Sequence, residues 1–210
     1  MTLELWHCKD SRSLRPLWTL EELGLDYRLH LLTFPPRMSD PTFVERNPLG
    51  TVPYLVDGDT WMTESAAICH YLAVRHGDGA LAVAPDSAGY GAFLNWLYHA
   101  DATLTFPQTL VLRYGRFEPP ERRQPQVVED YTQWYLARLK LVNAQIDGRD
   151  WLCEDRFTIA DIAVGYALYL GEVIGLARHY KPQTAAYLER LKARPAFARA
   201  NAVGSPLPGV

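Results

Sequence analysis

The sequence has few cysteines, no excess of positive charge and no long hydrophobic run, and each absence excludes a class of protein. Three cysteines in 210 residues, with no C-x-x-C pair, fit neither a disulfide-stapled fold nor a zinc site. Lysine and arginine together number 21 and the acidic residues 24, which argues against nucleic-acid binding. There is no run of about 18 apolar residues for a membrane span, and the first ten residues lack a signal-peptide pattern. We therefore expect a cytoplasmic protein that engages neither membrane nor nucleic acid.

Several catalytic signatures are missing as well. The six histidines show no HExxH or i,i+4 pairing, and the chain has no GxGxxG motif, no P-loop and no GxSxG elbow. We expect no bound metal. What the chain does have is apolar residues, at 48% of its length, which are enough to build the core of one large or two small domains.

The first third of the chain alternates strand and helix patterns. A turn signal, Asp57-Gly58-Asp59, separates two short strands, and Gly24 is a natural end for a preceding helix. The expected elements are, in order, strand 2–8, helix 14–23, strand 27–33, hairpin strands 53–57 and 60–63, and helix 64–76. This order predicts an α/β domain over residues 1–78, with a small mixed sheet covered by helices.

The remainder of the chain shows only helical patterns. Residues 79–85, rich in Gly, Ala and Pro, are the expected linker. Helix 159–175 is almost wholly apolar and should be central, with Thr158 and Asp161 as a structural capping box. An all-helical domain is therefore predicted over 86–210, with a frayed tail and with helices at 87–114, 125–146, 159–175, 182–193 and 195–202.

Residues 8–16 (CKDSRSLRP) join the first strand to the first helix. A proline is tolerated only in the first turn of a helix, so with Ser13 as the N-cap Pro16 becomes the third helical residue. Ser11 then lies beside a helix N-terminus, where free N–H groups are expected and its hydroxyl can hydrogen-bond an anion such as a thiolate. The alternative is that both serines only cap the helix.

Two further segments each allow a binding and a structural interpretation. A cis bond before Pro53 would turn the N–H and C=O of Val52 outward, toward an extended peptide; a trans proline at an edge strand is the alternative. Glu64 and Ser65 begin a helix, where the hydroxyl and the free N–H groups can hold a carboxylate and Glu64 an ammonium. A zwitterionic amino-acid end fits both residues; a capping pair without a ligand is the alternative.

Taken together, four segments resemble the soluble glutathione S-transferases, most closely the bacterial and fungal members with a serine-type loop. The segments are DSRSLRPLWTLEELGLDY, NPLGTVPYL, TESAAICHYL and FTIADIAV, in this order over nearly the whole chain. The resemblance implies a thioredoxin-like domain followed by an all-helical domain, and a homodimer. It also implies an enzyme that conjugates the thiolate of glutathione, its co-substrate, to small hydrophobic electrophiles, without any other cofactor.

The resemblance also assigns roles to residues. Ser11, with Ser13 as second choice, matches the hydroxyl that activates the glutathione thiol. Val52, before the cis proline Pro53, matches the residue whose backbone pairs with the cysteinyl unit. Further candidates for substrate binding are Glu64 and Ser65 for the γ-glutamyl end, Thr51 where many relatives have lysine, Arg37 for the glycine carboxylate, Asp101 for the glutathione of the other subunit, and Phe106 and Tyr114, with Tyr98 and Leu104, for the electrophile. For each of these last four residues, plain interhelical core is the alternative.

Two other functions are open on the same fold. Cys8-Lys9-Asp10-Ser11 is a C-x-x-S at the position of the redox cysteine of thioredoxin-like proteins, and it resembles the cysteine-type transferases. In that case the chain would be a glutathione-dependent thiol-disulfide oxidoreductase that uses Cys8. Because a fold does not guarantee an activity, a non-catalytic glutathione-binding or structural homologue is the third possibility.

Overall fold

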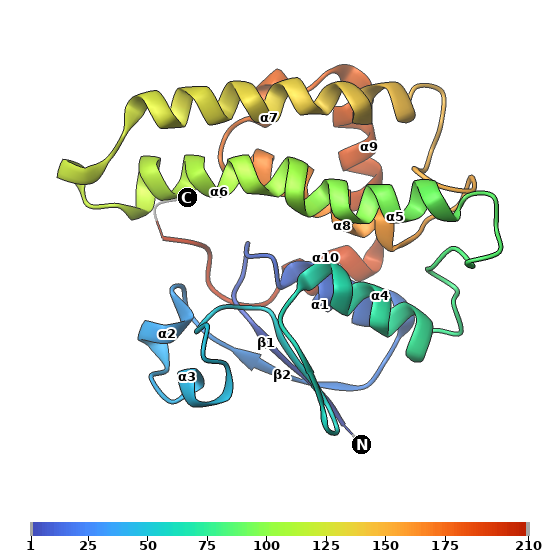
Figure 1. The fold of residues 1–210 in the computed structure, drawn as a ribbon, viewed down its shortest axis with the longest axis horizontal. Helices are drawn as coiled ribbons and strands as arrows, with labels where there is room; N and C mark the ends of the chain where they lie inside the picture. Colours follow the sequence, from blue (N-terminus) through green and yellow to red (C-terminus); the bar gives the residue numbers. More distant parts are fainter. Residues whose placement is uncertain (1, 209–210) are drawn as a thin grey trace. The chain divides into compact units, whose positions relative to one another are not determined.

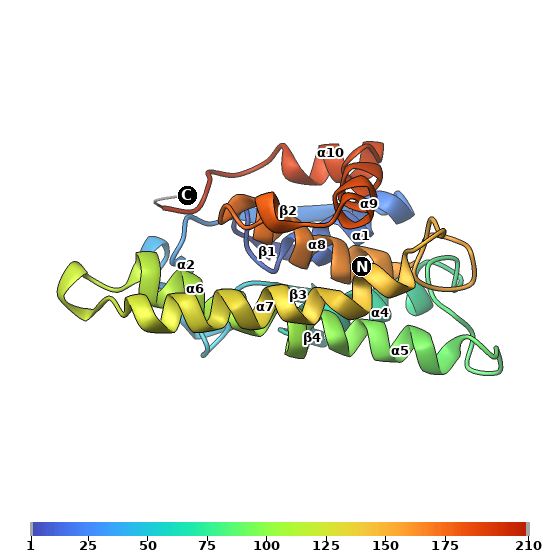
Figure 2. The ribbon, with the colours of Figure 1, turned by 90° about the horizontal axis from the view of Figure 1, so that it is seen from above.

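The computed structural model describes residues 2–208, which divide into two compact units (Figures 1 and 2). Unit 1 comprises residues 2–82 together with 192–208, and unit 2 comprises residues 83–191. The predicted division differed, because it placed 192–208 in the helical domain. Within the described residues, no helix combines the length and the hydropathy needed to cross a bilayer.

Unit 1 is built on a four-stranded sheet with the order β2-β1-β3-β4. β1 runs parallel to β2 through the crossover helix α1 and antiparallel to β3, which forms a hairpin with β4. Helix α4 packs against α1. The bounds are β1 (Leu3–His7), α1 (Leu14–Leu23), β2 (Tyr27–Leu31), β3 (Tyr54–Asp57), β4 (Thr60–Met62) and α4 (Ser65–Arg75). The predicted thioredoxin-like βαβ-ββα domain is confirmed.

The two faces of β1 carry different side chains. Strand alternation places His7 on the same face as Leu5, and Cys8 on the same side as Trp6. Trp6 packs in a cluster with Cys8, Phe43 and neighbouring apolar residues. Phe43 belongs to α3 (Phe43–Arg46), which follows α2 (Pro36–Ser39). Sequence patterns did not predict these two helices, since four residues are too few to show a helical period.

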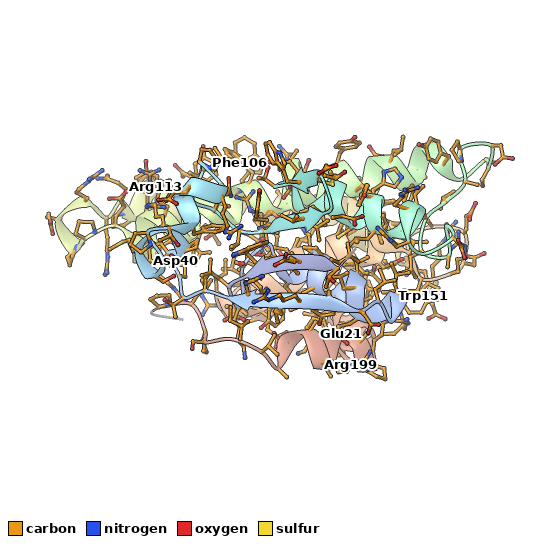
Figure 3. All side chains as sticks on the ribbon, turned by 90° about the horizontal axis from the view of Figure 1, so that it is seen from below. Glu21, Asp40, Phe106, Arg113, Trp151 and Arg199 are labelled. Atoms are coloured by element: carbon orange, nitrogen blue, oxygen red, sulfur yellow. The ribbon has the colours of Figure 1, made fainter. Side chains whose placement is uncertain are left out.

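The C-terminal segment packs on α1, which explains its place in unit 1. α10 (Pro195–Asn201) contacts α1, where the rings of Trp18 and Phe197 meet edge to face at 4.9 Å. Arg199 of α10 pairs with Glu21 of α1 (Figure 3). These contacts join elements that are more than 170 residues apart in the sequence.

The tail after α10 is ordered against the loop that precedes α1. Leu207 is only 4% exposed, and its N–H donates to the carboxylate of Asp10 at 3.3 Å. Gly204 lies against Lys9, so closely that a Cβ at this position would lie 3.1 Å from the Cβ of Lys9. The prediction of a frayed tail is therefore wrong at Gly204 and Leu207, which pack against this loop.

Unit 2 is all-helical, as predicted. The long helix predicted at 87–114 is a continuous run in which two π-helical stretches, η1 and η2, follow α5 and α6. Figures 1 and 2 show α6 alongside α7, which it contacts. The bounds are α5 (Tyr90–Tyr98), η1 (His99–Thr105), α6 (Phe106–Leu112), η2 (Arg113–Phe117), η3 (Pro120–Arg122), α7 (Pro125–Gln145), α8 (Ile159–Val173), η4 (Ala177–His179) and α9 (Pro182–Lys192).

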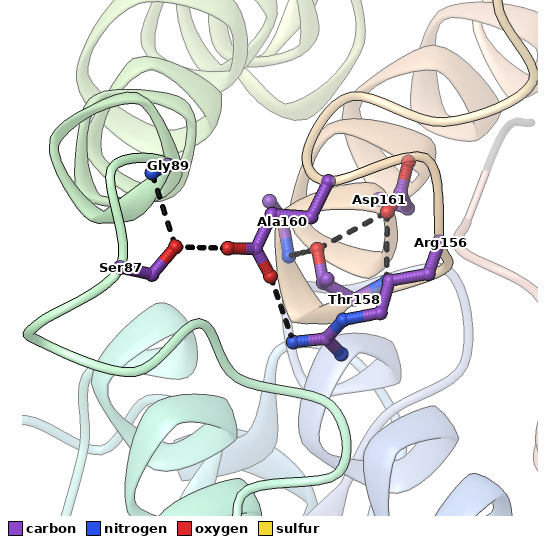
Figure 4. A network of polar contacts seen from close by, with 7 residues as sticks. Ser87, Gly89, Arg156, Thr158, Ala160 and Asp161 are labelled. Carbon is purple, nitrogen blue, oxygen red and sulfur yellow. Dashed lines mark hydrogen bonds and ion pairs between the residues drawn. The ribbon is translucent and has the colours of Figure 1, made fainter.

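Helix α8 is buried on almost every side, and its start is closed by a polar network (Figure 4). The Asp161 carboxylate accepts hydrogen bonds from the N–H of Thr158 at 2.8 Å, the N–H of Leu152 at 3.0 Å and the hydroxyl of Tyr187 at 2.7 Å. The Thr158 hydroxyl in turn accepts from the N–H of Ala160. The predicted capping box is confirmed, and its groups are satisfied by one another.

Candidate active site

The loop between β1 and α1 folds back onto the end of β1 through Ser13. The Ser13 hydroxyl lies 2.8 Å from Nδ1 of His7, 3.2 Å from the backbone N of Cys8 and 2.7 Å from the hydroxyl of Ser11. Ser11 also donates to the carbonyl of Cys8 at 2.7 Å. Ser13 is wholly buried, whereas Ser11 is partly exposed. Of the two serines, Ser11 is therefore the one that a ligand can reach.

Helix α1 begins where the sequence predicted, but Ser13 does not cap it. Ser13 has helical dihedrals, with φ −69° and ψ −11°, and its hydroxyl points back to the strand and makes no cap bond. The N–H groups of Leu14 and Arg15 bond instead to the carbonyls of Ser11 and Arg12, at 3.0 and 3.2 Å. The expectation of free N–H groups is therefore wrong for Leu14 and Arg15, and what α1 offers Ser11 is the positive end of its dipole.

The peptide bond between Val52 and Pro53 is cis. Within residues 2–208, the backbone of Val52 makes no hydrogen bond. Gly50, in the same loop, has φ +58°, and a Cβ there would lie 2.9 Å from the Cβ of Arg37. This close approach requires glycine. It also places Arg37, which is exposed, beside the loop that carries Thr51.

The start of α4 is open. Glu64 occupies the N-cap position but makes no cap bond, and its side chain is exposed. Within residues 2–208, the N–H groups of Ser65, Ala66 and Ala67 make no hydrogen bond. The buried Ser65 hydroxyl accepts from Arg15 Nη1 at 2.9 Å. Because arginine can only donate, the Ser65 hydroxyl proton stays available for another acceptor. The capping interpretation of this pair is therefore wrong.

The candidate residues of unit 2 differ widely in exposure. Leu104 is wholly buried, so it belongs to the core and cannot contact an electrophile. Asp101 lies in η1 and is half-buried. Phe106, at the start of α6, is 51% exposed (Figure 3), and Tyr98 is more exposed still. Tyr114 is half-buried beneath the guanidinium of Arg113, 5.6 Å from its ring.

Two residues of this region were not predicted from the sequence. His7 and Arg15 are both fully buried, and each contacts a candidate serine. A signal for His7 was present, since it stands where the alternation of β1 calls for an apolar side chain. The sequence signal for Arg15 was weaker: it lies three residues before the buried Trp18, and so on the same side of the helix.

Cys8 is 1% exposed, and burial raises its pKa to about 12. A thiol with so high a pKa is almost entirely protonated at neutral pH, whereas redox cysteines react as thiolates. The oxidoreductase alternative therefore lacks its reactive group. Among the described residues, no three His, Cys, Asp or Glu side chains gather into a metal-binding group.

The comparisons with known proteins agree with this architecture. Residues 11–75 match the family model described as "Glutathione S-transferase, N-terminal domain". The chain is 29% identical to glutathione S-transferase 3 of Zea mays, over 90% of this chain and 87% of that protein. It is 28% identical to glutathione S-transferase GstA of Escherichia coli O157:H7, over 92% and 94%.

Solved structures of similar fold include some with a bound ligand, of which we take one as an example. It is a glutathione transferase family member from Pseudomonas fluorescens Pf-5 with two glutathione bound, similar to this chain with a TM-score of 0.80 and 26% identity. The match covers 95% of this chain and 92% of that one. In sequence and structure, the chain is therefore similar to the glutathione S-transferases. These comparisons agree with the family resemblance that the sequence predicted.

Proposed function

We propose that this chain is a serine-type glutathione S-transferase in which the Ser11 hydroxyl donates a hydrogen bond to the glutathione sulfur. The observation that carries the proposal is the contrast in the loop after β1. Ser11 is partly exposed at the positive end of α1, whereas Ser13 and Cys8 are buried. Of these three residues, Ser11 is therefore the one that can meet a thiolate.

The size of this effect is sufficient for catalysis. A free thiol has a pKa of about 8.5, and the thiolate is the nucleophile. A hydrogen bond to a charged group contributes roughly 1.5–3 kcal/mol, which lowers the thiol pKa by about one to two units. The dipole of α1 acts in the same direction. Much of the bound glutathione would then be thiolate at neutral pH.

The open start of α4 supports the position proposed for the γ-glutamyl end. Its carboxylate would accept from the Ser65 hydroxyl and the first N–H groups of α4, and Glu64 would pair with its ammonium. The unbonded backbone of Val52 would pair with the cysteinyl unit. Arg37 would attract the glycine carboxylate, while Thr51 supplies no cation. The glutathione bound in the Pseudomonas fluorescens structure supports the same choice of ligand.

The rest of the proposal concerns the second substrate and the assembly. The electrophile is a small hydrophobic molecule, with the exposed Phe106 and the half-buried Tyr114 as its candidate contacts.

We propose a cytoplasmic homodimer in which Asp101 reaches the glutathione of the other subunit, with no cofactor beyond glutathione. Light scattering should give twice the chain mass of 23.8 kDa. A species of 23.8 kDa at micromolar concentration would refute the dimer.

Glutathione titration and conjugation kinetics test the function. Isothermal titration should show saturable binding, and Ser65→Ala and Glu64→Gln should each weaken it by more than about tenfold, because a charged partner loses its contact. Ser11→Ala should keep binding, raise the thiol pKa by about one to two units and slow conjugation of chlorodinitrobenzene at neutral pH about 10- to 100-fold. No heat at millimolar glutathione, or an unchanged rate in Ser11→Ala, would contradict the proposal.

A further inference from the structure

His7 is a fully buried polar side chain at the end of β1. Its Nδ1 lies 2.8 Å from the Ser13 hydroxyl. Among the described residues, none lies within hydrogen-bond distance of its Nε2. The ring therefore has one polar contact, and that contact leads through Ser13 to Ser11, 2.7 Å further on.

The unpartnered Nε2 decides which ring nitrogen holds the proton. Burial lowers the pKa of His7 to about 4, so the ring is neutral at pH 7 and holds a single proton. A buried N–H without an acceptor is rarer in proteins than a buried acceptor without a donor. The proton therefore belongs on Nδ1, which then donates to the Ser13 hydroxyl.

This choice fixes the direction of every hydrogen bond that follows. The Ser13 oxygen accepts from His7 Nδ1–H and from the Cys8 N–H at 3.2 Å, which occupies both of its lone pairs. Its own proton has two acceptors in reach, the Ser11 oxygen at 2.7 Å and the Cys8 carbonyl at 3.2 Å, and we assign it to the nearer one, Ser11. Ser11 also accepts from the Ser13 N–H at 3.3 Å, so the Ser11 hydroxyl can only donate.

Without a ligand, the Ser11 proton is donated to the carbonyl of Cys8. That carbonyl also accepts the Ser11 N–H at 3.3 Å, so it keeps a partner when the hydroxyl turns toward a sulfur. The opposite tautomer would reverse the chain of hydrogen bonds. Ser13 would donate to Nδ1 and its oxygen would be open to the Ser11 proton, so Ser13 would compete with a ligand for that proton.

We infer that His7 is a positioning residue, which acts through Ser13 to hold the Ser11 hydroxyl as a hydrogen-bond donor toward the glutathione sulfur. The inference rests on the proposed function, whereas the His7 tautomer does not depend on it. The first test therefore needs no ligand. Nitrogen-15 NMR of the histidine rings in the full chain at neutral pH should show the proton of His7 on Nδ1. A proton on Nε2 would overturn the inference.

The second test uses variants and measures the pKa of the bound glutathione thiol from the ultraviolet absorbance of its thiolate. His7→Leu and Ser13→Ala should each raise this pKa by about half a unit, because Ser11 loses the polarisation that the chain of hydrogen bonds provides. His7→Asn should restore it, since its amide can donate from near the position of Nδ1. Glutathione affinity should change little, because the contacts at α4 remain.

A double-mutant cycle separates positioning from a general structural role. In a Ser11→Ala background, His7→Leu should no longer shift the thiol pKa, since its effect passes through Ser11. An equal shift in both backgrounds, or none in a His7→Leu protein that binds glutathione, would overturn the role of His7. If His7→Leu does not fold, an unshifted pKa in Ser13→Ala overturns it instead. A wild type that binds no glutathione would overturn the proposed function itself and this role with it, whatever the tautomer.

Discussion

Two helices of this protein begin in opposite ways, one in each unit. At the start of α8, the Thr158 hydroxyl and the Asp161 carboxylate take up the polar groups around them. At the start of α4, Glu64 makes no cap bond and the first three N–H groups stay open. A cap is worth about 1 kcal/mol, so leaving it out sacrifices stability. The open helix start retains groups that can bind an anion.

A similar contrast holds between the polar networks at the starts of α8 and of α1. Asp161 accepts from three different residues, and nothing in that network is left for a ligand. In the loop between β1 and α1, the hydrogen bonds run from His7 outward and end on the partly exposed hydroxyl of Ser11. A closed network stabilises a fold, whereas an open one directs a donor toward solvent. The predictions below test this difference, in order of the expected effect.

Removing the centre of the closed network should have the largest effect. Asp161→Ala leaves the hydroxyl of Tyr187 and the N–H groups of Thr158 and Leu152 buried without an acceptor, each at about 1–3 kcal/mol, so we expect a loss of about 4 kcal/mol. Urea unfolding followed by circular dichroism measures it. Asp147→Ala, at an exposed aspartate near the end of α7, is the matched control and should change stability by less than about 0.5 kcal/mol. A loss below about 1 kcal/mol in Asp161→Ala would contradict the closed network.

Lowering the pH should destabilise the folded chain through His7, the buried end of the open network. Burial lowers the His7 pKa from 6.5 to about 4. Between these values the unfolded chain takes up a proton that the folded chain does not, so stability falls as pH falls. The full pKa shift corresponds to about 3 kcal/mol of folding stability, of which about 2 kcal/mol is already lost near pH 5.

The pH effect of His7 is isolated by comparing the wild type with His7→Asn. Burial also lowers the pKa of His70 and His99, so these residues contribute a loss of the same sign in both proteins. Chemical unfolding at neutral pH and near pH 5 should show a smaller loss in His7→Asn. Parallel curves for the two proteins would mean that His7 is not held neutral by burial.

The sequence predicted most elements of both units because their signals are local. The capping box of α8, the turn at Asp57-Gly58 and the apolar run of 159–175 are each readable within a few residues, and the structure has all three. The open start of α4 was readable only as two alternatives. Whether Ser65 caps or binds depends on Arg15, which lies fifty residues away.

The remaining differences have the same origin in long-range contacts. Ser13 was expected to cap α1, but its hydroxyl is held by His7 on β1, outside the helix. The tail was expected to fray, but Leu207 bonds to Asp10, 197 residues earlier in the chain. A local pattern cannot show which distant group competes for a hydroxyl or an N–H. This is also why Leu104 was left open between core and ligand contact, and the structure shows that it is core.

A direct comparison of the two N-cap residues should give a moderate effect. Thr158→Ala should lower stability by about 1–2 kcal/mol, because the N–H of Ala160 loses its acceptor. Glu64→Ala should change stability by less than about 0.5 kcal/mol, since the side chain caps nothing, while it weakens glutathione binding. For each variant, urea unfolding gives the change in stability and isothermal titration gives the change in glutathione affinity. Equal destabilisation by the two substitutions would contradict the contrast between α4 and α8.

The smallest effect is expected at the buried cysteines, because burial raises the thiol pKa in both units alike. Burial raises the pKa of Cys8 in unit 1 and of Cys153 in unit 2 to about 12, so at neutral pH only about one molecule in 10⁵ holds either thiol as a thiolate. Native protein incubated with glutathione disulfide should therefore show no glutathione adduct by mass spectrometry, and urea-unfolded protein should show one. Cys8→Ser should leave conjugation unchanged within about twofold, since the rate depends on Ser11. A native adduct on Cys8, with disulfide reduction lost in Cys8→Ser, would instead establish the oxidoreductase function.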